Sequence, residues 1–258
     1  MLIGAMNHPM QDLEQEIHDF AAAGFEFVDI TLEPVGARPD QVDARSVRRA
    51  LDSNGLRAVG HTAWYMPIAS QFPELRQAGI DILVQCMRTF SDIQVPLMTV
   101  HPDIRREQRG PAALAAANAE SIAQLTEVGQ GLGVRLMVEN QAGTFSQVKY
   151  MSRILDSAPA AGFHLDAAHS NLSGHYNRVD ELLEAFAHRL VHVHLSDNKG
   201  GDWDLHLPLG AGSIDWQRVI RSLKDAGYDG TVTLEVFADR DLLVLSRKRF
   251  QEWWEQVD

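Results

Sequence analysis

Residues 134–139, VRLMVE, form a short apolar run that ends in a carboxylate, Glu139. Residues 162–166, GFHLD, repeat this arrangement and end in Asp166. Short apolar runs bounded by turn residues are typical of strands buried on both faces of a parallel sheet. A carboxylate at the end of such a strand is costly to bury unless it is paired or binds a cation. The two segments therefore predict buried parallel strands whose ends carry the chemistry of the protein.

Similar apolar runs recur along the whole chain and alternate with segments of helical periodicity. The eight runs are residues 2–6, 25–32, 56–60, 97–100, 134–138, 162–165, 190–195 and 231–237. Eight strand–helix units in 258 residues match the length and rhythm of an α/β protein that is a single (β/α)8 TIM barrel domain over residues 1–258. A doubly wound open sheet is the alternative, but the sequence lacks the glycine-rich phosphate loop that would favour it.

The segments between the runs carry the usual signals for helix ends. An alanine-rich helix is expected over residues 112–130, with Gly131 as its end. Ser213 is expected to cap a helix that runs to Gly227, and a last helix is expected over residues 239–257.

Composition limits the possible partners and the location. The chain has 23 basic and 35 acidic residues and a net charge of −12, so general nucleic-acid binding is disfavoured and DNA is the less expected partner. A single cysteine, Cys86, excludes an intramolecular disulfide and a cysteine-rich zinc site. No apolar run approaches the ~18 to 20 residues of a membrane span. The first residues do not resemble a signal peptide, so a cytoplasmic protein without a membrane partner is expected.

The predicted strand ends carry side chains that can bind a metal ion. In such a barrel the active site is built from the C-terminal ends of the strands and the loops that follow them. The nine candidate ligands there are His61, His101, Glu139, Asp166, His169, His194, Asp204, His206 and Glu235. Crowded carboxylates repel one another unless a divalent cation lies among them, and mixed nitrogen and oxygen ligands suit zinc or manganese. The spacing of His164 and His192 places both one layer deeper, where they would orient ligands by hydrogen bonding.

At these positions the sequence resembles the xylose isomerase-like TIM barrel superfamily. This superfamily joins sugar and sugar-phosphate isomerases and epimerases to the endonuclease IV-type enzymes of AP endonuclease family 2. The motifs that carry the resemblance are HTAWY at 61–65, VHP at 100–102, VENQAG at 138–143, LDAAH at 165–169, HLSDN at 194–198, DLHLPLGAG at 204–212, SIDW at 213–216 and LE at 234–235.

The resemblance to the isomerases and epimerases implies one metal ion held by Glu139, Asp166, His194 and Glu235. Glu139 and Glu235 would also be the acid/base pair, with proton transfer through a metal-stabilised enediolate, and His169 would contact the substrate. Arg105, Arg106 or Lys199 could hold a terminal phosphate or carboxylate. The chain departs from the ketohexose epimerases after strand seven, where Lys199 and its neighbours replace the usual arginine.

The resemblance to the endonuclease IV-type enzymes implies three zinc ions held by all nine candidate ligands. Trp64 would then correspond to an aromatic residue near the DNA lesion. We expect a metal-dependent sugar or sugar-phosphate isomerase/epimerase with one to three zinc or manganese ions, a small carbohydrate-like substrate and a possible homodimer. The alternative enzyme is an endonuclease IV-like zinc phosphodiesterase, and a barrel retained only for binding is a third hypothesis.

Overall fold

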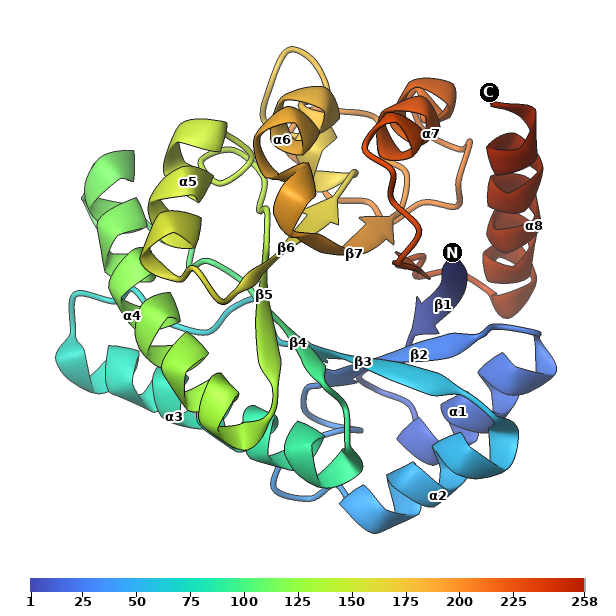
Figure 1. Ribbon diagram of the computed structural model, residues 1–258, viewed down its shortest axis with the longest axis horizontal. Coiled ribbons are helices and arrows are strands. Elements are labelled where there is room, and N and C mark those ends of the chain that lie inside the picture. Colours follow the sequence, from blue (N-terminus) through green and yellow to red (C-terminus); the bar gives the residue numbers. More distant parts are fainter. Residues whose placement is uncertain (258) are drawn as a thin grey trace.

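Each expected apolar run forms a strand in the computed structural model, which describes residues 1–257. The strands are β1 (Leu2–Met6), β2 (Phe27–Leu32), β3 (Arg57–Thr62), β4 (Leu97–Val100), β5 (Arg135–Glu139), β6 (Gly162–Asp166), β7 (Leu190–Leu195) and β8 (Thr231–Leu234). Consecutive strands pair in parallel, and β8 pairs with β1 to close the barrel. The predicted (β/α)8 TIM barrel is confirmed, and its helices surround the strands (Figure 1).

One helix follows each strand. The helices are α1 (Leu13–Ala22), α2 (Ala44–Asn54), α3 (Pro73–Ile93), α4 (Pro111–Leu132), α5 (Val148–Ser157), α6 (Val179–Phe186), α7 (Trp216–Asp225) and α8 (Arg240–Gln256). Short 3-10 turns lie at His169–Asn171 and Ala187–Arg189.

Two expected helix boundaries are wrong. Helix α4 continues through Gly131 and ends before Gly133, because the left-handed backbone conformation that ends a helix falls at Gly133, with φ 72°. Helix α7 is capped by Asp215, whose side chain accepts a hydrogen bond from the backbone N–H of Arg218. The Ser213 hydroxyl instead donates to the carbonyl of Asn198.

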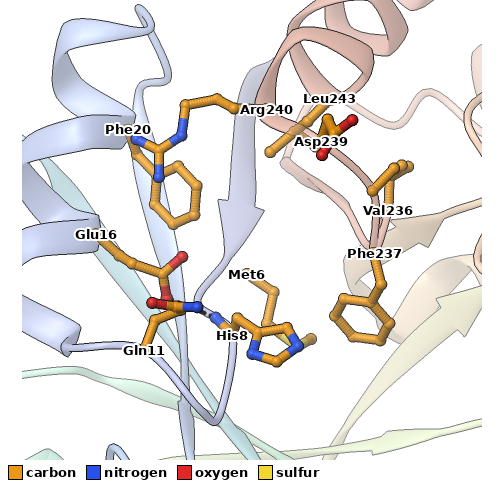
Figure 2. A pocket seen from close by; sticks show the side chains of 11 residues that line it. Met6, His8, Gln11, Glu16, Phe20, Val236, Phe237, Asp239, Arg240 and Leu243 are labelled. Atoms are coloured by element: carbon orange, nitrogen blue, oxygen red, sulfur yellow. Dashed lines mark hydrogen bonds between the residues drawn. The ribbon is translucent and has the colours of Figure 1, made fainter.

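A cavity of about 600 Å³ opens between the ends of β1 and β8 and helices α1 and α8 (Figure 2). Figure 2 shows His8 and Phe237 on one side of the cavity, and their rings meet edge to face with centroids 6.0 Å apart. Glu16 on α1 and Arg240 on α8 also line the cavity. The cavity therefore combines aromatic and charged walls.

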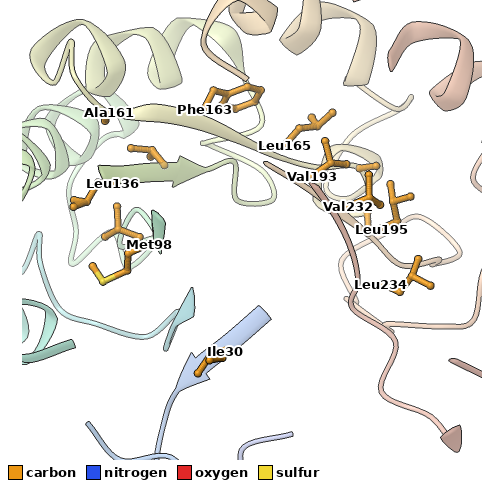
Figure 3. Packing of buried hydrophobic residues seen from close by; sticks show 14 of the residues in the cluster. Ile30, Met98, Leu136, Ala161, Phe163, Leu165, Val193, Leu195, Val232 and Leu234 are labelled. Carbon is orange, nitrogen blue, oxygen red and sulfur yellow. The ribbon is translucent and has the colours of Figure 1, made fainter. Parts of the chain in front are cut away.

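The apolar core lies mainly between the strands and the helices. Phe163, Leu165 and Val193 belong to this layer (Figure 3), and the Phe163 ring lies 5.2 Å from that of Phe186 on α6. Because side chains alternate along a strand, the neighbours of these residues point into the barrel. The N-terminal end of the barrel is filled by a small apolar cluster of Phe27, Val59 and Met137. Above it the interior is polar.

No helix within residues 1–257 is both long enough and apolar enough to cross a membrane.

Candidate metal centre

The carboxyl ends of the strands bring buried imidazoles and carboxylates together at one mouth of the barrel. Strand pairing sets Asp166 on β6 beside His194 on β7, and Thr31 on β2 beside His61 on β3. Asp166 and His194 are fully buried. The structure therefore gathers side chains that are far apart in the sequence.

Glu139 lies at the centre of the first group. Its Oε2 atom is 3.0 Å from His101 Nε2 and 3.6 Å from His61 Nε2. Its Oε1 atom is 3.1 Å from His169 Nδ1. Its Oε2 atom also lies 3.4 Å from His164 Nδ1, so one carboxylate faces four imidazoles, which come from β3, from β6 and from the residues that follow β4 and β6.

Glu235 follows β8 and forms a second group with His194. The distance from Glu235 Oε2 to His194 Nδ1 is 3.1 Å. Ligand atoms of His61, His194 and Glu235 all lie within 4.8 Å of one another. Because His61 also belongs to the group around Glu139, the two groups share a ligand and are continuous.

The loop after β7 supplies a third group. Asp204 Oδ2 lies 2.9 Å from His169 Nε2 and 3.2 Å from His206 Nε2. The Nδ1 atom of His206 lies 3.1 Å from the backbone carbonyl oxygen of Glu235. All nine predicted ligands therefore lie in one connected cluster.

The unpaired atoms of the cluster suit a cation. Asp166 Oδ2, Asp204 Oδ1 and His101 Nδ1 are buried and have no hydrogen-bond partner. A buried polar atom without a partner costs about 1 to 3 kcal/mol, and a divalent cation would satisfy such carboxylate oxygens. The mixture of imidazole and carboxylate donors fits zinc or manganese.

The pKa values of two side chains in the cluster are raised above their usual values. Burial and the charges of Glu139 and Glu235 raise the pKa of Asp166 to about 7, although His169 opposes the shift. Burial would lower the pKa of His206, but Glu235 and Asp204 raise it to about 9. Around neutral pH, protons therefore occupy positions that a bound cation would take.

A deeper layer lies beneath the mouth and contains the two histidines expected there. His164 Nδ1 is 3.0 Å from the Thr99 hydroxyl, and His192 Nδ1 is 2.7 Å from the Thr231 hydroxyl. Sequence reasoning missed Asp29, which is fully buried on β2 and is 3.1 Å from His192 Nε2. The available signal was a charged residue inside the otherwise apolar and hydroxyl-bearing strand FVDITL.

Of the predicted substrate-binding residues, His169 belongs to the cluster, whereas the other four lie on loops around the mouth, outside it. Trp64 is exposed beside Tyr65, and Lys199 is exposed in the loop after β7. Arg105 forms an ion pair of 2.8 Å with Asp103, and Arg106 lies 3.4 Å from the Thr144 hydroxyl. Among the described residues, no hydrogen bond or ion pair joins these four side chains to the nine ligands.

The cavity beside β1 and β8 adjoins the cluster. Phe237 lines this cavity, and its ring centroid lies 4.6 Å from that of His206. His8 also lines it. A molecule bound at the cluster could therefore extend into the cavity.

A closed parallel barrel with a buried cluster of imidazoles and carboxylates at its mouth defines the class of this protein. The chain belongs to the xylose isomerase-like TIM barrel family, whose model matches residues 17–256. This confirms the resemblance found in the sequence.

Individual relatives are distant. The chain is 25% identical to the uncharacterized protein MJ1311 of Methanocaldococcus jannaschii, over 74% of this chain and 67% of the relative. It is 22% identical to the L-ribulose-5-phosphate 3-epimerase UlaE of Shigella flexneri, over 84% of this chain and 79% of the relative. The crystal structure of a D-tagatose 3-epimerase-like protein matches with a TM-score of 0.86 at 21% identity, covering 100% of this chain and 98% of the other.

Proposed function

We propose that this protein is a divalent-metal-dependent sugar epimerase or isomerase that moves a proton on a ketose carbon. The observation that carries the proposal is the placement of Glu139 and Glu235. Both are buried. Glu139 ends β5 and Glu235 follows β8, and each has a ligand atom within 4.8 Å of a His61 ring nitrogen. Two carboxylates that reach one space suit proton removal from one side of a carbon and proton return on the same or the other side.

Glu139, Asp166, His194 and Glu235 would hold the cation. When bound, it would draw electron density from neighbouring carbonyl and hydroxyl oxygens and so acidify the carbon–hydrogen bond between them. One glutamate accepts that proton, and the same or the opposite glutamate returns a proton to the carbon. Such acid–base transfer contributes roughly 10² to 10⁴-fold to the rate. His169, next to Glu139, would contact the substrate.

The cavity beside the cluster favours an uncharged substrate tail. Glu16 and Asp239 give it two carboxylates, and its one arginine, Arg240, is 2.7 Å from Asp19 and so already paired. Phe237 and His8 offer aromatic surface to the carbon skeleton of a sugar. An unphosphorylated ketose fits these walls better than a sugar phosphate. The relatives are named for both kinds of substrate, so the choice rests on the cavity.

A second candidate function is hydrolysis of a phosphodiester at a multinuclear zinc site. The observation that favours it is the group of His169, Asp204 and His206, which the proton-transfer mechanism uses only in part. His61 and His101 beside Glu139 likewise exceed the needs of one cation. Several clustered cations would activate water and stabilise the attacking and leaving oxygens.

The deciding experiment combines metal analysis with isotope exchange. Protein purified without a metal-affinity tag is analysed for bound elements, and is then incubated with a panel of unphosphorylated ketoses in deuterated water. We expect about one divalent cation per chain and deuterium on a carbon next to the carbonyl, detected by NMR. Two or three zinc ions, no exchange and cleavage of a small phosphodiester would overturn this proposal in favour of the second candidate.

A further inference from the structure

Asp29 reaches across the interior of the barrel to strands that do not neighbour its own. It lies on β2, and its Oδ2 atom is 2.7 Å from His194 Nε2 and 2.9 Å from the Thr233 hydroxyl. The same oxygen is 3.1 Å from His192 Nε2. Strands β1 and β8 separate β2 from β7 in the barrel. A buried carboxylate with three such contacts is a specific arrangement, since charged side chains are rarely fully buried without partners.

These contacts determine which nitrogen of His194 faces the mouth. An ionised carboxylate only accepts hydrogen bonds, so His194 Nε2 must carry the hydrogen that it donates to Asp29. In the neutral imidazole the lone pair is then on Nδ1, which lies 3.1 Å from Glu235 Oε2. Nδ1 is thus the atom directed to the candidate cation site.

His192 supports the same carboxylate from below. Its Nε2 donates to Asp29, so its Nδ1 accepts from the Thr231 hydroxyl at 2.7 Å. Both ring nitrogens of His192 are therefore hydrogen-bonded. This histidine helps to hold Asp29 in place and does not itself reach the mouth.

We propose that Asp29 is the positioning residue that fixes the orientation and tautomer of His194 as a cation ligand. The part of this proposal that concerns cation affinity rests on the proposed function, because it requires a cation at His194. A carboxylate behind a ligating histidine orients the ring and increases its basicity, and removal of such a carboxylate typically lowers metal affinity about 10 to 100-fold.

The first test needs neither a variant of Asp29 nor a metal. Metal-free protein with ¹⁵N-labelled histidine is examined by NMR, and the His194 signals are assigned by their loss in His194→Gln. We expect a slowly exchanging Nε2–H proton at the low-field position of an imidazole bonded to a carboxylate. An exposed or rapidly exchanging Nε2–H would overturn the proposal even if the protein binds metal as expected.

The second test compares the zinc affinity of Asp29→Asn and Asp29→Ala with that of the wild type, by competition with a coloured chelator. Asp103→Asn is the matched control, since Asp103 is a buried carboxylate whose hydrogen bonds do not involve the nine ligands. We expect an affinity loss of about 10 to 100-fold in the Asp29 variants, with a shift of the His194 ¹⁵N signals in zinc-loaded Asp29→Asn. Wild-type affinity with unchanged His194 signals in Asp29→Asn would overturn the proposal.

The two tests separate the failure of this proposal from failure of the proposed function. If the wild type binds no zinc or manganese, the cation at His194 is disproved, while the metal-free NMR result still decides whether Asp29 orients His194. If the wild type binds a cation and the Asp29 variants bind it equally well, only the role of Asp29 is disproved.

Discussion

His169 and Asp204 meet over the mouth of the barrel, with 2.9 Å between His169 Nε2 and Asp204 Oδ2. His169 follows β6, whereas Asp204 is in the loop between β7 and α7. The contact folds this loop back over the end of the preceding strand. It also joins a side chain beside Glu139 to one beside His206, so the cluster is continuous across the mouth.

Replacing either central glutamate should remove catalysis. We expect Glu139→Gln and Glu235→Gln each to lower isotope exchange by roughly 10² to 10⁴-fold, because glutamine cannot accept the proton. Deuterium incorporation by NMR measures the effect, with Glu184→Gln on the exposed face of α6 as control. Wild-type exchange in either glutamine variant would show that the site is wrongly assigned.

The loop ligands distinguish the two candidate functions. If one cation serves proton transfer, the double variant Asp204→Ala/His206→Ala should keep about one cation per chain and measurable exchange, since Glu139, Asp166, His194 and Glu235 remain. Elemental analysis and the exchange assay check this. A drop from three zinc ions to two, with loss of phosphodiester cleavage, would instead support the hydrolase.

Cation binding should release protons and strengthen as pH rises. Two of the proposed ligands hold protons that a cation must displace: Asp166, with a pKa raised to about 7, and His194, whose pKa Glu235 and Asp29 raise well above its usual value. Affinity is therefore expected to increase as pH rises through about 7 and to keep increasing above it. Calorimetric titration in two buffers of different ionisation enthalpy counts the protons. Binding that releases none at neutral pH contradicts this prediction.

The preference of the protein for a neutral over a phosphorylated ketose should depend on the charge of Glu16. Burial raises the pKa of this carboxyl, but its Oε2 still accepts a hydrogen bond of 2.6 Å from the backbone N–H of His8. Glutamine keeps an acceptor and removes the charge. We expect Glu16→Gln to increase kcat/KM for a phosphorylated ketose relative to its neutral counterpart by up to about five-fold, the range of a weak charge interaction that solvent screens. An unchanged ratio would remove the cavity from the substrate site.

The stability of the loop that carries Asp204 and His206 should depend on the side chain of Asp197. This buried carboxylate accepts hydrogen bonds from the backbone N–H of Gly210 at 2.8 Å and from Trp216 Nε1 at 2.9 Å. Asp197→Asn replaces one acceptor by a donor, and we expect a loss of about 1 to 3 kcal/mol in the free energy of unfolding. Urea denaturation measures the loss, and a change in tryptophan fluorescence is expected with it. Equal stability would mean that the loop is held by its backbone contacts.

The strand ends of this protein are predictable because two simple regularities coincide. Apolar runs identify the strands, and parallel strands in a closed barrel bring all their carboxyl ends to one mouth. Glu139, Asp166 and His194 could therefore be expected together although the chain separates them widely. The polar residue Asp29 was not predictable in this way, because it lies within a strand and its partners come from the far side of the barrel.

The partners of the arginines after β4 could not be predicted from the sequence. From the sequence, Arg105 and Arg106 could hold an anion; in the structure Arg105 is paired with Asp103, and Arg106 lies 3.4 Å from the Thr144 hydroxyl. Loop side chains choose their partners by the path of the backbone, and periodicity carries no information on that path.

The sequence by itself determined the barrel, the strands and the meeting of the nine candidate ligands at one mouth, because hydrophobic periodicity is a local property and parallel pairing repeats the same strand direction eight times. Only the tertiary structure decided which atoms face one another: the nitrogen of His194 that Asp29 holds, the closure of Asp204 over His169, and the cavity beside Phe237. These depend on distances between segments that are remote in the chain, and those distances arise only when the barrel closes.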